Sequence, residues 1–244
     1  MSRPRPLVSV LVAAWNQASS LERSLQSLRH QTVDRSVFEI IVVDDGSTDG
    51  TGQLLSGYRD EVTVITTPHA GLAAACNAGL AAARGRYLIR VDSDDAAEPA
   101  LLEAELTVLE RAPDIVCVSS DRHEESDGTV RLVRVREGVL YDLIACGALM
   151  RLETVRAVGG YRPIFWEEYD LFIRLRQQGR FAHVPMPLYR YRRHSESLTA
   201  RREDRQRGWE ELAALWGPQV LRSFGAHAEM EETVTALQSR AAGA

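Results

Sequence analysis

The first half of the chain alternates short apolar runs with segments of helical periodicity. The apolar runs are rich in Val, Ile and Leu and predict strands at 7–14, 38–43, 62–66, 86–91 and 114–119. Apolar residues recur at helical spacing in the segments between them, at 19–29, 51–58, 72–84 and 99–111. This alternation predicts an α/β fold, with a mostly parallel sheet flanked by helices. In such sheets, ligands bind at the carboxyl ends of the strands.

The second half of the chain has a less regular pattern. It predicts a polar loop at 121–128, a strand at 129–136, an apolar segment at 147–152, a turn at 159–161, an amphipathic helix at 165–178 and a strand at 185–191. The last segment, 202–237, predicts two helices broken at Gly217 and Pro218. We therefore expect a domain over 1–200, with halves of about 1–95 and 96–200, and a helical C-terminal extension over 201–244.

An acidic cluster follows the predicted strand at 86–91, where Asp92, Ser93, Asp94 and Asp95 are consecutive. Adjacent carboxylates repel one another, and burial increases that penalty. A hard divalent cation such as Mg²⁺ or Mn²⁺ removes both problems and keeps open positions for substrate phosphates. The alternative is an acidic cap for the next helix, but a single Asp would serve that purpose.

A second acidic run, from Asp44 to Asp49, follows the strand at 38–43. One of its carboxylates could accept a hydrogen bond from the N3–H of a uracil or thymine ring. Ser47 and Asp49 are better explained as turn residues. Trp15 follows the first strand, where an aromatic ring could stack on a base, although an isolated Trp more often packs within the fold.

Two further polar segments lie in the second half. Glu167 and Glu168 open the amphipathic helix, where the helix dipole favours acids, so by themselves they need no catalytic explanation. Asp170 and Arg174 stand one helical turn apart and are expected to pair. Alternating Tyr and Arg residues precede His194, and this segment could bind a diphosphate and complete a metal shell, or be a solvated basic strand.

Composition narrows the classes of protein. The net charge of −5 gives no general affinity for nucleic acid, and all 29 basic residues are Arg. Because the chain has no Lys, a lysine Schiff base and a Walker-type phosphate loop are excluded. The longest apolar runs are too short for a transmembrane segment, and no apolar signal region precedes the first strand. We therefore expect a cytoplasmic protein, or one peripheral to a membrane.

Two nucleotide-binding classes are also excluded. Sugar nucleotidyltransferases carry a glycine-rich loop with Arg and Lys after the first strand, where this chain has Ala13, Ala14, Trp15 and Asn16. Nicotinamide dehydrogenases bind their dinucleotide through a motif of three glycines, and Leu55 stands where the third glycine would be. The acids that precede this segment would also repel a pyrophosphate.

Taken together and in order, these motifs resemble the inverting glycosyltransferases of family 2, which have the A-type nucleotide-sugar fold. The resemblance covers about 7–198. It rests on segments 8–16, 28–31, 39–49, 71–77, 85–87, 92–95, 159–161, 167–174 and 191–194. No single motif is decisive, but the ordered set is specific.

The resemblance implies an enzyme that moves a sugar from a nucleoside-diphosphate sugar, with UDP-sugars favoured, to an acceptor hydroxyl. It implies Glu168 as the catalytic base and a Mn²⁺ or Mg²⁺ cofactor bound by Asp94, His194 and Asp92. Residues 1–95 would bind the nucleotide and 96–200 the acceptor. Contacts with the donor are implied for Ala13, Trp15, Asp45, Asp92, Ser93, Asp94 and Arg192, with Trp15 and Asp45 at the base.

Two positions depart from the family's pattern. Cys76 stands where the family usually has Arg before Asn77, so a donor contact is lost or is supplied by another arginine, such as Arg84 or Arg192. Glu168 replaces the usual Asp and reaches one methylene further. These departures keep open a non-catalytic relative that acts as a nucleotide-binding or scaffold protein. The acceptor stays open among a glycan, a lipid-linked and a small molecule, and the helical extension could pack on the domain or form a homodimer.

Overall fold

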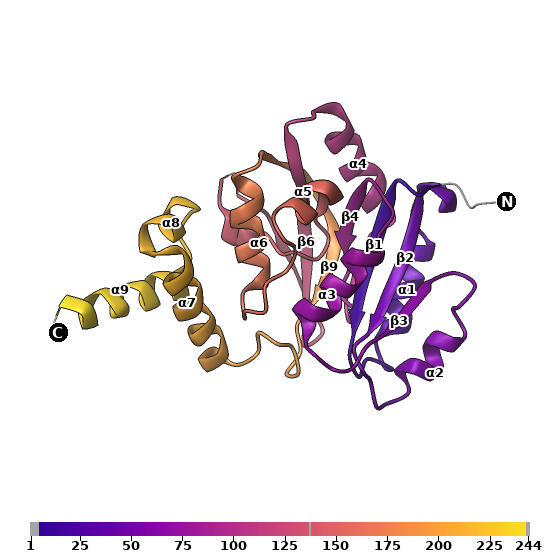
Figure 1. The fold of residues 1–244 in the computed structure, drawn as a ribbon, viewed down its shortest axis with the longest axis horizontal. Coiled ribbons are helices and arrows are strands. Elements are labelled where there is room, and N and C mark those ends of the chain that lie inside the picture. The colour runs from indigo at the N-terminus through magenta and orange to yellow at the C-terminus, as the bar shows by residue number, and fades with distance from the viewer. Residues whose placement is uncertain (1–4, 137, 243–244) are drawn as a thin grey trace.

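A computed structural model of the chain describes residues 5–136 and 138–242. Helices flank a twisted sheet, and the C-terminal helices lie along one side of the molecule (Figure 1). The expectation that no signal region is present rests on residues 1–4, which lie outside the described residues. Within 5–136 and 138–242, no helix is long and apolar enough to cross a membrane.

The first half of the chain forms a parallel part of the sheet, with strands in the order β3, β2, β1, β4. The strands are β1 (Val8–Ala14), β2 (Phe38–Asp44), β3 (Thr63–Thr66) and β4 (Tyr87–Arg90). The connecting helices are α1 (Leu21–Arg29), the 3₁₀ helix η1 (Arg35–Val37), α2 (Thr51–Ser56) and α3 (Leu72–Ala82). The prediction of an α/β fold is confirmed, and strand and helix bounds in this half shift by only a few residues.

The second half adds antiparallel strands, so the complete sheet is mixed. Its strands are β5 (Ala96–Ala97), β6 (Ile115–Ser126), β7 (Thr129–Val133), β8 (Leu149–Arg151) and β9 (Arg180–Arg192). β8 runs antiparallel to β4 and β6, whereas β9 runs parallel to β6. The expectation of a loop at 121–128 is wrong, because β6 continues to Ser126. Its polar second half pairs with both β7 and β9, and this pairing overrides a loop-like composition.

The remaining helices are α4 (Leu101–Arg111), the 3₁₀ helix η2 (Leu140–Asp142), α5 (Leu152–Ala157), α6 (Glu167–Arg176), α7 (Arg202–Trp216), α8 (Pro218–Ser223) and α9 (Ala228–Ala242). The predicted break at Gly217 and Pro218 is confirmed, since Gly217 has φ +78° and Pro218 opens α8. The expectation of two helices in this segment is wrong. The chain turns again after Ser223, where Gly225 has φ +105°.

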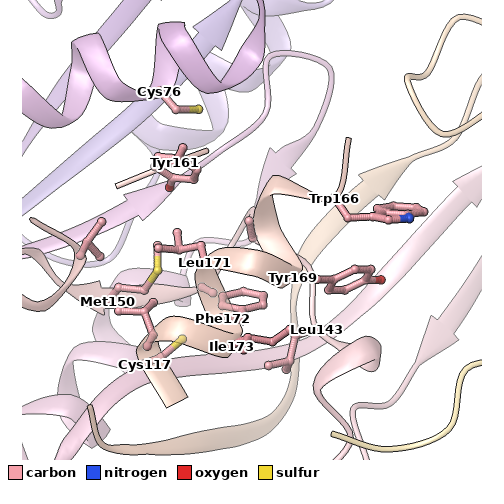
Figure 2. Packing of buried hydrophobic residues seen from close by; sticks show 14 of the residues in the cluster. Cys76, Cys117, Leu143, Met150, Tyr161, Trp166, Tyr169, Leu171, Phe172 and Ile173 are labelled. Atoms are coloured by element: carbon pink, nitrogen blue, oxygen red, sulfur yellow. The ribbon is translucent and has the colours of Figure 1, made fainter. Parts of the chain in front are cut away.

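An apolar cluster joins one face of the sheet to the C-terminal helices. Leu171, Phe172 and Ile173 of α6 pack against Met150 and Cys117 of the sheet (Figure 2). The cluster continues into α7, whose Trp209 ring centroid lies 5.1 Å from that of Trp166 and 5.3 Å from that of Tyr169. The C-terminal helices therefore pack on the rest of the chain, next to the start of α6.

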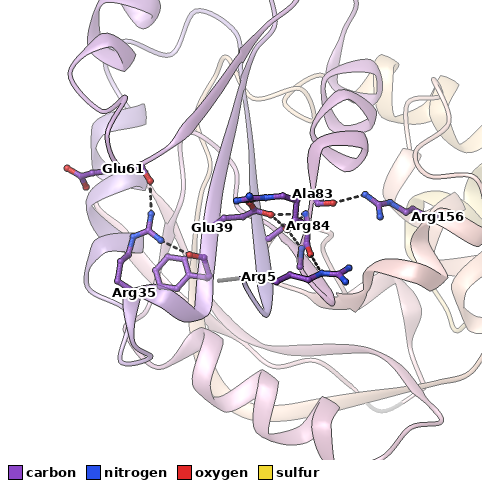
Figure 3. Close-up of polar contacts among 10 residues, drawn as sticks. Arg5, Arg35, Glu39, Glu61, Ala83, Arg84 and Arg156 are labelled. Atoms are coloured by element: carbon purple, nitrogen blue, oxygen red, sulfur yellow. Dashed lines mark hydrogen bonds and ion pairs between the residues drawn. The ribbon is translucent and has the colours of Figure 1, made fainter. Parts of the chain in front are cut away.

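The amino ends of the parallel strands are joined by a polar network around Glu39 (Figure 3). Its carboxylate accepts hydrogen bonds from the Ser9 hydroxyl at 2.7 Å and the Arg84 backbone N–H at 2.8 Å. The Arg84 guanidinium adds bonds of 2.9 and 2.7 Å. Arg156 lies nearby and donates to the carbonyl oxygens of Leu80 and Ala83, at 2.8 and 2.7 Å. Arg84 therefore holds the fold at this end of the sheet, and its expected role as a substitute donor contact is wrong.

Candidate active site

The strands on either side of β1 bring their acidic residues to one edge of the sheet. β1 and β2 end in register, with Ala14 opposite Asp44, and the Asp45 N–H donates to the Ala14 carbonyl at 2.9 Å. β4 lies on the other side of β1 and ends at Arg90, two residues before Asp92. The two acidic runs that the sequence singles out therefore share the carboxyl edge, as the strand pattern predicts.

The acidic cluster is organised by Arg90, a residue that the sequence patterns do not single out. Its buried guanidinium donates to both carboxylate oxygens of Asp92, at 2.7 and 3.0 Å. A third bond of 2.9 Å joins it to Glu167 at the start of α6. The available signal was an arginine at the end of a strand whose other residues are buried and mostly apolar. One guanidinium thus connects the acidic cluster after β4 to the start of α6.

Arg90 also lies beside Cys76 of α3. Burial raises the pKa of the Cys76 thiol to about 12, and the Arg90 guanidinium opposes that rise. The arginine next to Cys76 therefore comes from the neighbouring strand β4. Neither Arg84 nor Arg192 holds that place.

Asp94 and His194 are distant in the chain but adjacent in the fold. The Nε2 atom of His194 lies 2.8 Å from an oxygen of Asp94. Burial, followed by the charge of Asp92, raises the pKa of the Asp94 carboxyl. Burial also raises the pKa of Asp95 well above its usual value, with Asp92 and Asp94 adding repulsion. A cation bound here would offset this repulsion.

Asp95 is bonded to residues of β9 and has a structural role. It is buried, accepts a 2.9 Å hydrogen bond from the Tyr189 hydroxyl and a 2.8 Å bond from the Arg192 N–H. The Tyr189 oxygen in turn accepts the Asp92 N–H at 3.0 Å. These bonds hold the end of β9 against the acidic cluster and bring His194 to Asp94.

Within 5–136 and 138–242, the three donors that lie close enough to share a cation differ from the predicted set of Asp94, His194 and Asp92. Oxygens of Asp92 and Asp95 and the sulfur of Cys146 lie within 4.8 Å of one another. Burial raises the pKa of Cys146 well above its usual value, so its thiol stays protonated and is a poor ligand for a hard cation. Asp94 and His194 instead offer a carboxylate oxygen and an imidazole nitrogen, and Mn²⁺ accepts both.

The other side of the edge carries an aromatic pair beside a buried carboxylate. Trp15 is 48% exposed and stacks on His69, with ring centroids 4.3 Å apart and planes 15° apart. His69 donates from Nδ1 to Asp45 at 2.9 Å, and the N–H groups of Ala70 and Gly71 donate to the same carboxylate at 3.0 and 2.8 Å. His69 was not among the predicted site residues. Its neighbours, Thr67 and Pro68, mark an ordinary turn, so only the fold places it at Asp45.

The remaining predicted residues lie along the same edge. Ala13 is half-buried in β1, Ser93 is buried within the acidic cluster, and the Arg192 side chain is exposed at the end of β9. Ser47 and Asp49 are turn residues, as predicted. The Ser47 N–H donates to Asp44, and Asp49 accepts the N–H and the hydroxyl of Thr51.

Glu167 and Glu168 have different surroundings although they are adjacent. Glu167 is buried and bound by Arg90. Glu168 is half-buried, and its Oε2 atom accepts the Ala145 N–H at 3.1 Å. Burial, followed by the charge of Glu167, raises the pKa of Glu168 to about 7. A carboxylate with this pKa is suited to accept a proton near neutral pH.

Asp170 is fixed behind these two acids. The predicted pair with Arg174 is confirmed, with bonds of 3.0 and 2.6 Å to one oxygen of Asp170. Arg162 and the indole N–H of Trp216 donate to the other oxygen, each at 3.0 Å. Because Trp216 belongs to α7, the C-terminal helices help to hold the start of α6.

These features have counterparts in known proteins. Residues 9–195 match the family model described as glycosyl transferase family 2. The chain belongs to this family. The match covers most of the chain and confirms the resemblance inferred from the ordered motifs. The family is one of glycosyltransferases, as expected.

Curated relatives share moderate sequence identity with the chain. It is 29% identical over 217 residues to a chondroitin synthase of Pasteurella multocida, covering 83% of this chain and 22% of the relative. It is 29% identical over 212 residues to a hyaluronan synthase of the same species, covering 81% of this chain and 21% of the relative. The chain thus spans about a fifth of the length of these synthases. A putative glycosyltransferase EpsE of Bacillus subtilis is also 29% identical, covering 80% of this chain and 76% of the relative.

Solved structures share the fold at lower identity. S. aureus TarS 1–349 in complex with UDP-GlcNAc superposes with a TM-score of 0.73 at 19% identity, covering 96% of this chain and 72% of that one. Mannosyltransferase PcManGT of Pyrobaculum calidifontis, in complex with GDP-Man and Mn²⁺, has a TM-score of 0.69 at 20% identity, covering 98% and 80%. The expected A-type nucleotide-sugar transferase fold is confirmed.

Proposed function

We propose that the protein is an inverting glycosyltransferase that moves a sugar from a nucleoside-diphosphate sugar to an acceptor hydroxyl. The observation that carries the proposal is the position of Glu168. It is a half-buried carboxylate with its pKa raised to about 7, next to a Glu167 that Arg90 ties to the acidic cluster. In this proposal, the general base and the diphosphate-binding edge lie on two sides of the Arg90 guanidinium.

On the donor side, the diphosphate is proposed to lie along the edge formed by Asp92, Ser93 and Asp94, with Arg192 beside it. A divalent cation, Mn²⁺ or Mg²⁺, held by Asp94, His194 and Asp92, would stabilise the departing nucleoside diphosphate as a Lewis acid. Asp94 and His194 already lie 2.8 Å apart, so the chain brings this pair together without a further rearrangement of the fold.

The base of the donor is proposed to lie beside Trp15 and Asp45, with Ala13 below it in β1. A carboxylate accepts hydrogen bonds, so it favours bases with a ring N–H, such as uracil. This favours UDP-sugars over donors whose base lacks a ring N–H at that position, such as CDP-sugars. The solved relatives bind UDP-GlcNAc in one case and GDP-Man in the other, and both bases carry such an N–H.

On the acceptor side, Glu168 takes the proton of the attacking hydroxyl. Its Oε2 atom is held by the Ala145 N–H, and Oε1 faces the acceptor in this proposal. Attack from the side opposite the departing diphosphate inverts the anomeric carbon. Glu167 keeps the start of α6 in position through Arg90, so its carboxylate does not compete for the proton.

The wider organisation of the protein follows from this assignment. We propose residues 1–200 as the catalytic domain and 201–244 as a helical extension that supports α6 through Trp209 and Trp216. The names of the two synthases favour a glycan as the acceptor over a lipid-linked or small molecule.

The test is a donor panel of UDP-, dTDP- and GDP-sugars with Mn²⁺ and with EDTA, using release of the nucleoside diphosphate as the readout. Release that requires Mn²⁺ supports the proposal, and the anomeric configuration of the product, read by NMR, tests inversion. If a donor binds and raises the melting temperature but no donor turns over with any acceptor, the protein is a nucleotide-binding scaffold instead.

A further inference from the structure

His69 makes, from within the protein, the two contacts that a nucleobase would make at this edge. Its planar ring lies flat on Trp15, with centroids 4.3 Å apart and planes 15° apart. Its Nδ1–H points at a carboxylate oxygen of Asp45, 2.9 Å away. Asp45 is an acceptor when ionised, so the imidazole carries its proton on Nδ1.

The Asp45 carboxylate has no acceptor position to spare. One oxygen accepts the Ala70 N–H at 3.0 Å and the Thr67 hydroxyl at 3.3 Å. The other accepts the Gly71 N–H at 2.8 Å and His69 Nδ1 at 2.9 Å. A carboxylate has about four lone-pair sites. A base N–H can therefore bind Asp45 only by replacing one of these four donors.

The backbone donors are fixed by the loop that carries them. The Thr67 N–H also donates to the Asp44 carbonyl at 3.0 Å. Gly46 approaches the same loop so closely that a Cβ at position 46 would lie 2.7 Å from the backbone nitrogen of His69. The His69 side chain, in contrast, is 49% exposed and turns about its own χ bonds. The Thr67 hydroxyl is a side-chain donor too, but its bond is longer, at 3.3 Å, and the imidazole is the donor that is stacked on Trp15. The imidazole is therefore the donor that a base can replace without moving the backbone.

We propose that the His69 imidazole occupies the base-binding position as an internal competitor, from which a nucleobase with a ring N–H donor displaces it. The inference rests on the proposed nucleotide-sugar donor and adds a competitor to its base site. Uracil, thymine and guanine offer a ring N–H that replaces Nδ1–H on Asp45. Cytosine and adenine present a bare ring nitrogen at the matching position, which a carboxylate repels.

The experiment is calorimetric titration of the whole chain with UDP and with CDP in the presence of Mn²⁺. His69→Ala removes the competitor, so the affinity for UDP should rise by about three- to tenfold, the equivalent of one net hydrogen bond. The UDP-over-CDP preference should widen, because only UDP gains a bond to Asp45. Manganese pyrophosphate, which lacks a base, should bind both proteins equally.

His30→Ala is the matched control. His30 is an exposed histidine directly after α1 that contacts the Gln26 carbonyl through Nδ1, so its loss should leave both affinities unchanged. Weaker UDP binding by His69→Ala would overturn the inference, because the imidazole would then be part of the bound pocket. Equal affinity would overturn it too, while leaving the proposed function intact. If the wild-type protein binds neither UDP nor GDP with Mn²⁺, the proposed donor and this inference both fail.

Discussion

The two ends of the parallel strands use the same residue types for opposite purposes. At the amino end, Glu39 is satisfied by Ser9 and by three nitrogens of Arg84. At the carboxyl end, three acids crowd together, and burial and mutual repulsion raise the pKa values of Asp94 and Asp95. At the amino end, the chain's own donors satisfy the carboxylate. The carboxyl end stores electrostatic strain that a bound cation would relieve.

The arginines of the two ends differ in burial as well as in partners. The Arg84 side chain is 56% exposed, whereas that of Arg90 is 4% exposed. Arg90 binds Asp92, just after its own strand, and Glu167 of α6, whose side chains are 24% and 8% exposed. We therefore expect changes at the carboxyl end to affect turnover and stability strongly and changes at the amino end to have small effects.

The largest effect is expected for Glu168→Gln. Loss of the general base should lower kcat by about 10²–10⁴-fold, with donor affinity by calorimetry unchanged. Glu167→Gln is the matched control and should have a much smaller effect, because its amide oxygen can still accept from Arg90. Glu168→Asp should keep partial activity. If Glu167→Gln abolishes turnover while Glu168→Gln retains it, the roles of the two acids are reversed.

Arg90→Met should cause the largest loss of stability. It leaves Asp92 and Glu167 without their cation, and breaking such a pair lowers the free energy of unfolding by about 3–5 kcal/mol. Urea denaturation measures this. A second variant tests whether the two acids need an arginine at position 90 itself or accept a guanidinium from a neighbouring helix. Cys76→Arg in the Arg90→Met background places an arginine on α3 beside the same acids, and it should recover part of the stability. If the Arg90→Met protein were as stable as wild type, the proposed role of Arg90 would be contradicted.

Asp94→Asn should weaken the binding of the divalent cation. Mn²⁺ should raise the melting temperature of wild type but not that of the variant, and the Mn²⁺ needed for half-maximal turnover should rise by about 100-fold or more. Because the folded-state pKa of Asp94 lies above its unfolded value, ionisation at neutral pH destabilises the fold. The metal-free variant should therefore melt at a higher temperature than wild type. Equal activity in EDTA and in Mn²⁺ would rule out the cation.

The pH dependence should report Glu168. The pKa of this carboxyl is raised to about 7, and only the ionised form accepts a proton. Activity should therefore be present above pH 7 and fall about tenfold per unit as the pH drops below it. The measurement is kcat/KM between pH 5 and pH 9 with saturating Mn²⁺. The residual activity of Glu168→Gln should lack this acidic limb, and a limb that persists in the variant would assign it to another group.

The smallest effect is expected for Arg84→Met at the amino end. Its partner Glu39 keeps the Ser9 hydroxyl and a backbone N–H, and the guanidinium is more than half exposed. The free energy of unfolding should fall by about 1 kcal/mol or less, with turnover unchanged. A loss as large as that of Arg90→Met would remove the contrast between the two ends.

Sequence patterns predicted the frame of the molecule well, because local signals dominate there. Apolar runs and helical spacing place β1 to β4 and their helices within a few residues of the structure. The pairing of Asp170 with Arg174 also followed from spacing alone, since residues one turn apart meet on any helix. The same local reasoning failed at 121–126, where polar residues extend β6 because β7 and β9 supply partners.

The sequence by itself determined the elements and the acids at their ends, because strand and helix periods and turn residues act over a few positions. Only the tertiary structure decided the partners. Arg90 meets Glu167 from 77 positions away and His69 meets Asp45 from 24 positions away, and no local pattern encodes either contact. Arg90 also distinguishes Glu167 from Glu168, because its guanidinium hydrogen-bonds the first of these adjacent acids, whereas the second is bound by a backbone N–H.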